Sequence, residues 1–209
     1  MINKMKTQFI ICLSLLVSAG VFAQAHKHHK MQNDQMDHSM MDHSSHGDMS
    51  MTESSIMTHS VSPAFQAQLN DVVKVTQELN ESFVEGNPSE VSSSARLVAN
   101  SIKEVDMSLL KQPEAHMEWM MNLKELNSSL NDIAESRDIG AQRTAFVQFN
   151  QALYRSIKSF GIGEQAFYQH CPMAMNNQGA YWISNNQEIR NPYFGNSMMS
   201  CGSTKEILN

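Results

Sequence analysis

Four apolar stripes at helical spacing constrain the fold of this chain more than any other feature of its sequence. After Pro63, apolar side chains recur every three or four residues, and the pattern restarts three times before Gly161. This period places the apolar residues on one face of an α-helix. The stripes contain, in chain order, Phe65, Leu69, Val72, Leu79 and Phe83; Val91, Ala95, Val98, Ile102, Val105 and Leu109; Trp119, Leu123, Leu126, Leu130 and Ile133; and Phe146, Phe149, Leu153, Ile157 and Phe160.

Turn and capping residues predict where these helices begin and end. The first is expected to end near Gly86, and Asn87 with Pro88 is typical of the start of the second. Pro113 is expected to open the third helix. Each should run for about 20 to 25 residues. Four such helices with short connections bury their stripes most simply as an up-down four-helix bundle, so the predicted fold class is all-α.

The last segment, residues 164–209, lacks a long helical period. It contains two of the five prolines and three of the four tyrosines, and we expect an irregular cap on the bundle with a short hairpin near residues 180–183. Arg190 is expected to anchor this cap through a carboxylate or a backbone carbonyl. Asn191 and Pro192 should form a turn that places Phe194 against the bundle. Residues 63–209 are thus predicted to be one domain.

The N-terminus has the three parts of a secretory signal peptide. Lys4 and Lys6 precede an apolar run at residues 9–17, and small residues follow up to Ala23. We expect cleavage after Ala23 or Ala25, and therefore a periplasmic protein. The apolar run is too short to cross a membrane, and no later segment of the sequence qualifies, so no membrane span is predicted.

Residues 24–62 form a His/Met-rich tail. Between His26 and Ser62 there is one Ile, one Val and no aromatic residue, so we expect this stretch to be disordered when no ligand is bound. It holds seven Met and seven His. Thioether sulfur suits Cu(I), and imidazole adds affinity for Cu(II). A polar linker, or loose binding of zinc or nickel, is the alternative. The candidate ligands here are His38, Met40, Met41, His43, His46, Met49 and Met51.

A second group of soft ligands lies in the C-terminal segment. Its members are His170, Cys171, Met173, Met198, Met199 and Cys201. They sit on two stretches that could converge into a low-coordinate Cu(I) site. In an oxidising compartment the two cysteines either pair or hold a soft metal. The alternative to a metal site is therefore a Cys171–Cys201 disulfide that braces the segment.

The third predicted helix carries one more candidate pair. His116 and Met120 are four residues apart, as are Met117 and Met121, so each pair shares a face of the helix. Such a pair could offer two ligands to one ion. The ordinary alternative is that these methionines fill an adaptable core.

Four ordered blocks of the C-terminal segment resemble an uncharacterised bacterial family: residues 170–174 (HCPMA), 179–184 (GAYWIS), 189–195 (IRNPYFG) and 198–202 (MMSCG). The similarity extends back through the helices to about Pro63, including residues 116–120 and 142–146. The family occurs alone or fused to the C-terminus of the periplasmic adaptor subunits of copper and silver efflux pumps. The resemblance implies a role in copper handling, and the adaptor portion is absent from this sequence.

These observations predict a non-catalytic copper-binding protein. The net charge of −6 makes nucleic acid a poor partner, and no catalytic motif is present, so we expect no enzyme activity. The predicted role is Cu(I) sequestration, delivery or resistance, with Ag(I), Cu(II) or Zn as other possible ions. The alternative is an interaction module that docks on a heavy-metal efflux adaptor, in which the cysteines form a structural disulfide.

Overall fold

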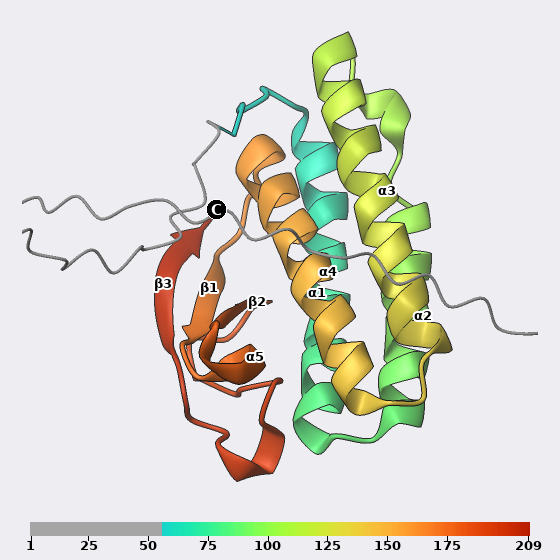
Figure 1. The fold of residues 1–209 in the computed structure, drawn as a ribbon. Helices are drawn as coiled ribbons and strands as arrows, with labels where there is room; N and C mark the ends of the chain where they lie inside the picture. Colours follow the sequence, from blue (N-terminus) through green and yellow to red (C-terminus); the bar gives the residue numbers. More distant parts are fainter. Residues whose placement is uncertain (1–55) are drawn as a thin grey trace, which may run out of the picture. The chain divides into compact units, whose positions relative to one another are not determined.

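A computed structural model describes residues 56–209 of the chain. Within this range, four long helices lie side by side, and consecutive helices run antiparallel (Figure 1). The four-helix part of the predicted fold is thereby confirmed. The helices are α1 (Pro63–Glu85), α2 (Pro88–Lys103), α3 (Pro113–Glu135) and α4 (Ile139–Phe160).

The predicted helix ends are confirmed, except at the end of α2. Gly86 follows α1 with a φ of 76°, a conformation that glycine adopts without steric cost. Asn87 caps α2 by accepting a hydrogen bond from the Ser89 N–H. However, α2 is 16 residues long, shorter than predicted. The Asp106 side chain accepts from the Ser108 N–H and so starts a 3₁₀ turn, η1 (Met107–Leu109), in place of further α-helix.

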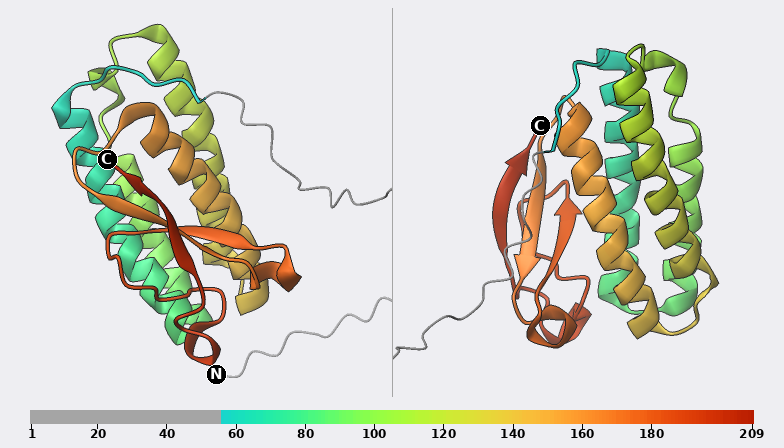
Figure 2. Two further views of the ribbon diagram at one scale, coloured as in Figure 1. Left: turned by 90° about the vertical axis from the view of Figure 1, so that its left-hand side faces the viewer. Right: turned by 45° about the horizontal axis from the view of Figure 1, so that its top comes forward.

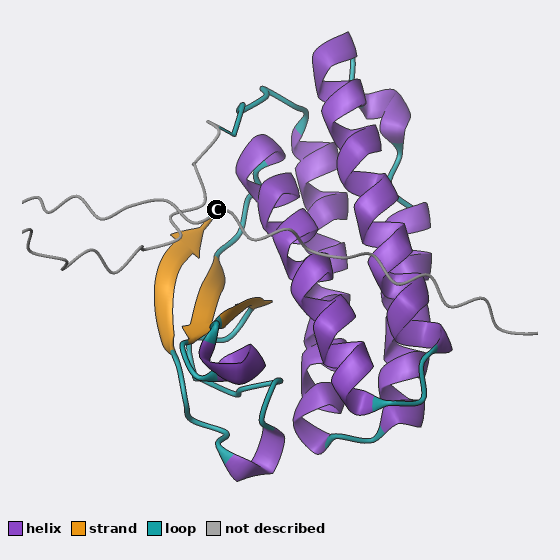
Figure 3. Cartoon of the chain, viewed as in Figure 1, coloured by secondary structure: helices purple, strands orange, loops and turns teal. Residues whose placement is uncertain are grey.

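The C-terminal segment contains three strands, β1 (Ala166–Cys171), β2 (Ala180–Ser184) and β3 (Ser203–Leu208), which form an antiparallel sheet in the order β2-β1-β3 (Figure 3). The predicted all-α class with an irregular cap is therefore correct only in part: the helices are confirmed, whereas the C-terminal cap contains strands. Residues 180–183 belong to a strand, as the expected hairpin requires, and this strand pairs with β1 from Phe167 opposite Ser184 to Cys171 opposite Ala180. The segment also contains a short helix, α5 (Ala174–Asn177), and a 3₁₀ turn, η2 (Gly195–Ser197).

The sheet lies against α1 and α4, on the side away from α2 and α3 (Figure 2). Two buried asparagines attach its edge strand β2 to the helices at Ile183. The Ile183 N–H donates to Asn150 Oδ1 of α4 at 2.9 Å, and Asn80 Nδ2 of α1 donates to the Ile183 carbonyl at 2.8 Å. The free edge of β2 thus finds partners in helix side chains.

One apolar core runs through the helices and under the sheet. At one end of the bundle, Phe160 meets Phe65 and Trp119 edge to face, with ring centroids 5.3 and 6.0 Å away. The His59 ring stacks on the same Phe160 at 5.5 Å. The segment that leads into α1 therefore packs on the end of α4.

No helix within residues 56–209 is long and apolar enough to cross a membrane. The predicted signal peptide lies outside the described residues, as does most of the predicted tail.

Candidate functional site

The fold brings together two cysteines that are 30 residues apart in the sequence. Cys171 is the last residue of β1 and is completely buried, whereas Cys201 lies just before β3 and is partly exposed. Their Sγ atoms are 2.9 Å apart, and both are free thiols. The sulfur of a residue at the end of a strand therefore lies against the sulfur of a residue in a loop.

Asn191 holds the loop that carries Cys201. Its Nδ2 donates to the Cys201 carbonyl at 2.7 Å, and its backbone N–H donates to the Met199 carbonyl at 2.8 Å. Its Oδ1 accepts from the N–H of Tyr193 at 2.8 Å. The predicted turn at Asn191 is confirmed. The aromatic residue that it buries most deeply is Tyr193, while Phe194 is only partly buried.

The electrostatics of the pair favour the protonated thiol. The hydrogen bond with Cys171, together with burial, raises the pKa of the Cys201 thiol. A metal ion or an oxidant reacts with the thiolate and must therefore displace this proton. The chemistry open to the pair is disulfide formation or binding of a thiophilic ion.

His170 lies on the other face of the sheet from Cys171, because successive residues of a strand point to opposite faces. Its ring packs against Tyr181 with centroids 4.2 Å apart. The ring also lies so close to Gly179 that a Cβ there would be 2.5 Å from Nε2. Burial, with a smaller contribution from Lys205, lowers the pKa of His170. The structure does not bring the His170 ring to the two sulfurs.

The Met199 sulfur lies beside the positively charged side chain of Arg190. Arg190 Nη1 lies 3.5 Å from the Met199 sulfur, and the same guanidinium forms a bidentate ion pair with Glu81 of α1. The predicted role of Arg190 as an anchor is confirmed. A guanidinium beside the sulfur disfavours a second cation there. Met198 contributes a backbone carbonyl that accepts from the Cys201 N–H at 3.1 Å.

Met173 lines a different feature, a cavity of about 620 Å³ beside the first turns of α4. Arg143 and the segment 175–177 also line it. Met175, Asn176 and Asn177 all have positive φ values, between 51° and 66°, which non-glycine residues adopt at a cost. Met173 is 47% exposed.

His116 and Met120 lie on the outer face of α3. Both are exposed, as are Met117 and Met121. The alternative that these methionines fill the core is therefore wrong, because Trp119 occupies the inward position of this stretch.

The tail ligands fall outside the described residues; they are His38, Met40, Met41, His43, His46, Met49 and Met51. Among residues 56–209, no group of three or more His, Cys, Asp or Glu side chains is arranged to hold a metal ion.

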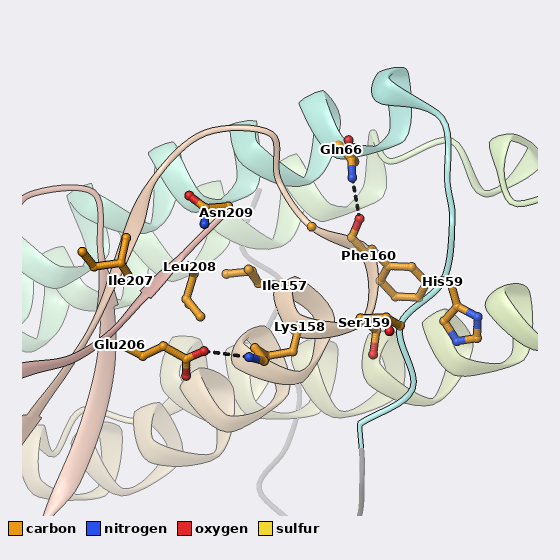
Figure 4. Close-up of a pocket in the computed structure, with 12 residues that line it drawn as sticks. His59, Gln66, Ile157, Lys158, Ser159, Phe160, Glu206, Ile207, Leu208 and Asn209 are labelled. Carbon is orange, nitrogen blue, oxygen red and sulfur yellow. Dashed lines mark hydrogen bonds and ion pairs between the residues drawn. The ribbon is translucent and has the colours of Figure 1, made fainter.

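A second cavity, of about 390 Å³, lies between the end of α4 and the end of β3 (Figure 4). Lys158 Nζ donates to Glu206 at 2.6 Å across its wall, and Gln66 Nε2 donates to the Phe160 carbonyl at 2.8 Å. None of the residues predicted as ligands lines this cavity.

Fold and site together define a helix-rich protein in which four helices support a small sheet, with one cysteine at the end of a strand in contact with another in a neighbouring loop. Residues 77–165 match the model of a family described as a protein of unknown function (DUF3347). The match covers less than half of the chain and ends before β1, so it includes most of the helices but neither cysteine. No curated protein and no solved structure is significantly similar to this chain.

Proposed function

We propose that this chain is a periplasmic protein that binds Cu(I) for sequestration or delivery, with copper as its cargo. The observation that carries the proposal is the pair of free thiols at Cys171 and Cys201, 2.9 Å apart at the sheet. Thiolate sulfur is a preferred ligand of Cu(I) and Ag(I). The soft ligands of the tail provide additional, more labile sites under this proposal.

Geometry indicates how the pair would accept an ion. Metal–sulfur bonds in proteins are about 2.3 Å long, so an ion bound to both sulfurs requires them to separate by about 1 Å or more from the observed contact. Cys171 is fixed at the end of a paired strand, whereas Cys201 lies in a loop. We therefore expect Cys201 and the turn stabilised by Asn191 to move when an ion binds, while Cys171 stays in place.

The test compares the chain without its predicted signal peptide, and hence without Cys12, with its C171S/C201S variant. Under anaerobic, reducing conditions, a chromophoric Cu(I) chelator competes with each protein, and a thiol reagent counts reactive cysteines with and without Cu(I). We expect Cu(I) to protect both thiols in the wild type and the variant to bind one equivalent less. The M173L variant serves as the control and should retain that equivalent. If the double variant binds as much Cu(I) as the wild type, the cysteine site is refuted.

A second candidate function rests on the same sulfur contact. The thiols are close enough to be oxidised with little movement, and a Cys171–Cys201 disulfide would make the C-terminal segment an architectural part of a module that docks on a heavy-metal efflux adaptor. Protein purified without reductant distinguishes the two functions. Absence of free thiols in both metal-free and copper-treated samples, with equal adaptor binding in a pull-down with and without copper, would favour the docking module.

A further inference from the structure

Three methionines near the start of α3 are exposed to solvent. Met117, Met120 and Met121 are 61%, 43% and 58% exposed. Methionine usually fills gaps in a core, and here Trp119, on the opposite side of the helix, does so while the sulfurs face outward. This arrangement leaves the apolar side chains without a packing role in the described part of the fold.

His116 completes a group of four side chains on one helix face. His116 and Met120 are four residues apart, as are Met117 and Met121, while Met117 and Met120 are three apart. Side chains at these spacings are neighbours, with Cβ atoms about 5 to 6 Å apart. Each of these three pairs can therefore offer two soft ligands to one ion, and Met120, a neighbour of both His116 and Met117, connects the pairs.

The surroundings leave this group available. Within residues 56–209, no hydrogen bond or ion pair engages the His116 ring. Glu114 lies one turn before Met117, Glu118 one turn before Met121 and Lys124 one turn after Met120, so the charges that flank the group are not predominantly positive. Thioether and imidazole ligands suit Cu(I) and Ag(I), and thioethers do not form disulfides.

The group lies at the end of the bundle where the chain from the tail joins the fold. Phe160 contacts both the His59 ring and Trp119, with centroid distances of 5.5 and 6.0 Å, and Met120 follows Trp119 directly. An exposed site here would be accessible to a soft ion that arrives from solvent or from another weak site.

We propose that His116, Met117, Met120 and Met121 form a surface site for a soft monovalent ion, Cu(I) or Ag(I). The inference rests on the proposed function for the identity of the cargo, but it uses none of the residues of the cysteine pair. It assigns to α3 a shallow site from which an ion exchanges readily, in contrast to the pair formed by the buried Cys171 and the partly exposed Cys201.

The test is an Ag(I) titration of the full chain labelled with ¹³C at the methionine methyl groups, because Ag(I) is diamagnetic and avoids copper redox chemistry. We expect saturable shifts of the Met117, Met120 and Met121 methyl signals and of the His116 ring signals, each assigned through single substitutions. Met107, which packs against the core, is the internal control. If the α3 signals move no more than Met107 when Ag(I) saturates the chain, the site does not exist.

The M117L/M120L/M121L variant tests whether the thioethers are the ligands. Leucine retains the apolar surface and the helix propensity but removes the sulfur, so the His116 shift should disappear if thioethers bind the ion. A His116 shift that persists in this variant would refute thioether ligation. Repeating the titration in C171S/C201S keeps the two proposals apart, since the α3 response should persist whether or not the cysteine site is real.

Discussion

Asn191 is completely buried, yet each polar atom of its side chain has a partner. Its Oδ1 accepts from the N–H groups of Tyr193 and Phe194, and its Nδ2 donates to the Cys201 carbonyl. Because an unpartnered buried polar group costs about 1 to 3 kcal/mol, this one side chain accounts for much of the order in the Cys201 loop.

We predict that N191A lowers the free energy of unfolding by about 2 to 4 kcal/mol, since it leaves two N–H groups and one carbonyl without their partner. It should also increase the rate at which Cys201 reacts with a thiol reagent. Urea unfolding under reducing conditions and a reaction time course provide the measurements. The matched control is N127A at an exposed position of α3, which should change stability by less than about 0.5 kcal/mol. Equal stability of the two variants would contradict the role of Asn191.

At the scale of elements, Glu206 joins β3 to α4. Its carboxylate accepts from Lys158 Nζ at 2.6 Å and from the Tyr154 hydroxyl at 2.8 Å. Burial by itself would raise the pKa of Glu206, but the hydrogen bonds from Lys158 and Tyr154 outweigh it and lower the pKa below the ordinary value of 4.5. The folded chain therefore binds this proton less tightly than the unfolded chain does. The stabilising contribution is present above pH 4.5 and is lost as pH falls through the lowered pKa.

We predict that E206Q destabilises the protein at pH 7 by less than about 1 kcal/mol, because the ion pair is about one-third exposed. The difference from the wild type should shrink towards zero as pH falls from 4.5 through the lowered pKa, because the native carboxyl then becomes protonated. Urea unfolding between pH 3 and pH 7 measures both effects. E104Q, at an exposed position after α2, is the control. A difference that is constant across this pH range would exclude the charge as its cause.

For the whole molecule, the cysteine pair closes a loop that contains α5, β2 and η2. A crosslink across about 30 residues stabilises a fold by roughly 3 kcal/mol when its chain-entropy effect is fully realised. Stability of the entire domain should therefore depend on the redox state of two side chains.

We predict that oxidised wild-type protein is up to about 3 kcal/mol more stable to urea than the reduced form, and that the stability of C171S/C201S is independent of reductant. A free-thiol count on each sample confirms its state. A wild type that stays reduced under mild oxidant, or that gains no stability on oxidation, would show that the thiol contact is not convertible to a bracing disulfide.

Local signals in the sequence predicted the helical part of the fold. The stripes, Gly86, Asn87 and Pro113 act through the backbone within a few residues, so they specify helix positions without knowledge of the tertiary structure. Only the end of α2 differs from the prediction. The Asp106 side chain caps a new turn in place of further helix, and the Asp106 N–H donates to Gln68 Oε1 of α1, a contact across the fold.

The sheet and the site depended on contacts that are distant in sequence. β1 pairs with β3 across the intervening residues 172–202. Strands of five or six residues are too short for their alternating pattern to identify them from the sequence alone. The sequence also left the cysteines open between a disulfide and a metal site. Strand alternation separates His170 from Cys171, and the Arg190 guanidinium contacts the Met199 sulfur while it pairs with Glu81 on α1.

By itself, then, the sequence determined the positions of four helices and supplied a set of candidate soft ligands, because periodicity and capping are local properties of the chain. Only the tertiary structure decided which ligands meet. It brought Cys171 to Cys201, moved His170 to the opposite face and turned Met117, Met120 and Met121 outward. The physical reason is that the direction of each side chain depends on strand pairing and on which helix face the core buries, and both are set by partners far away in the sequence.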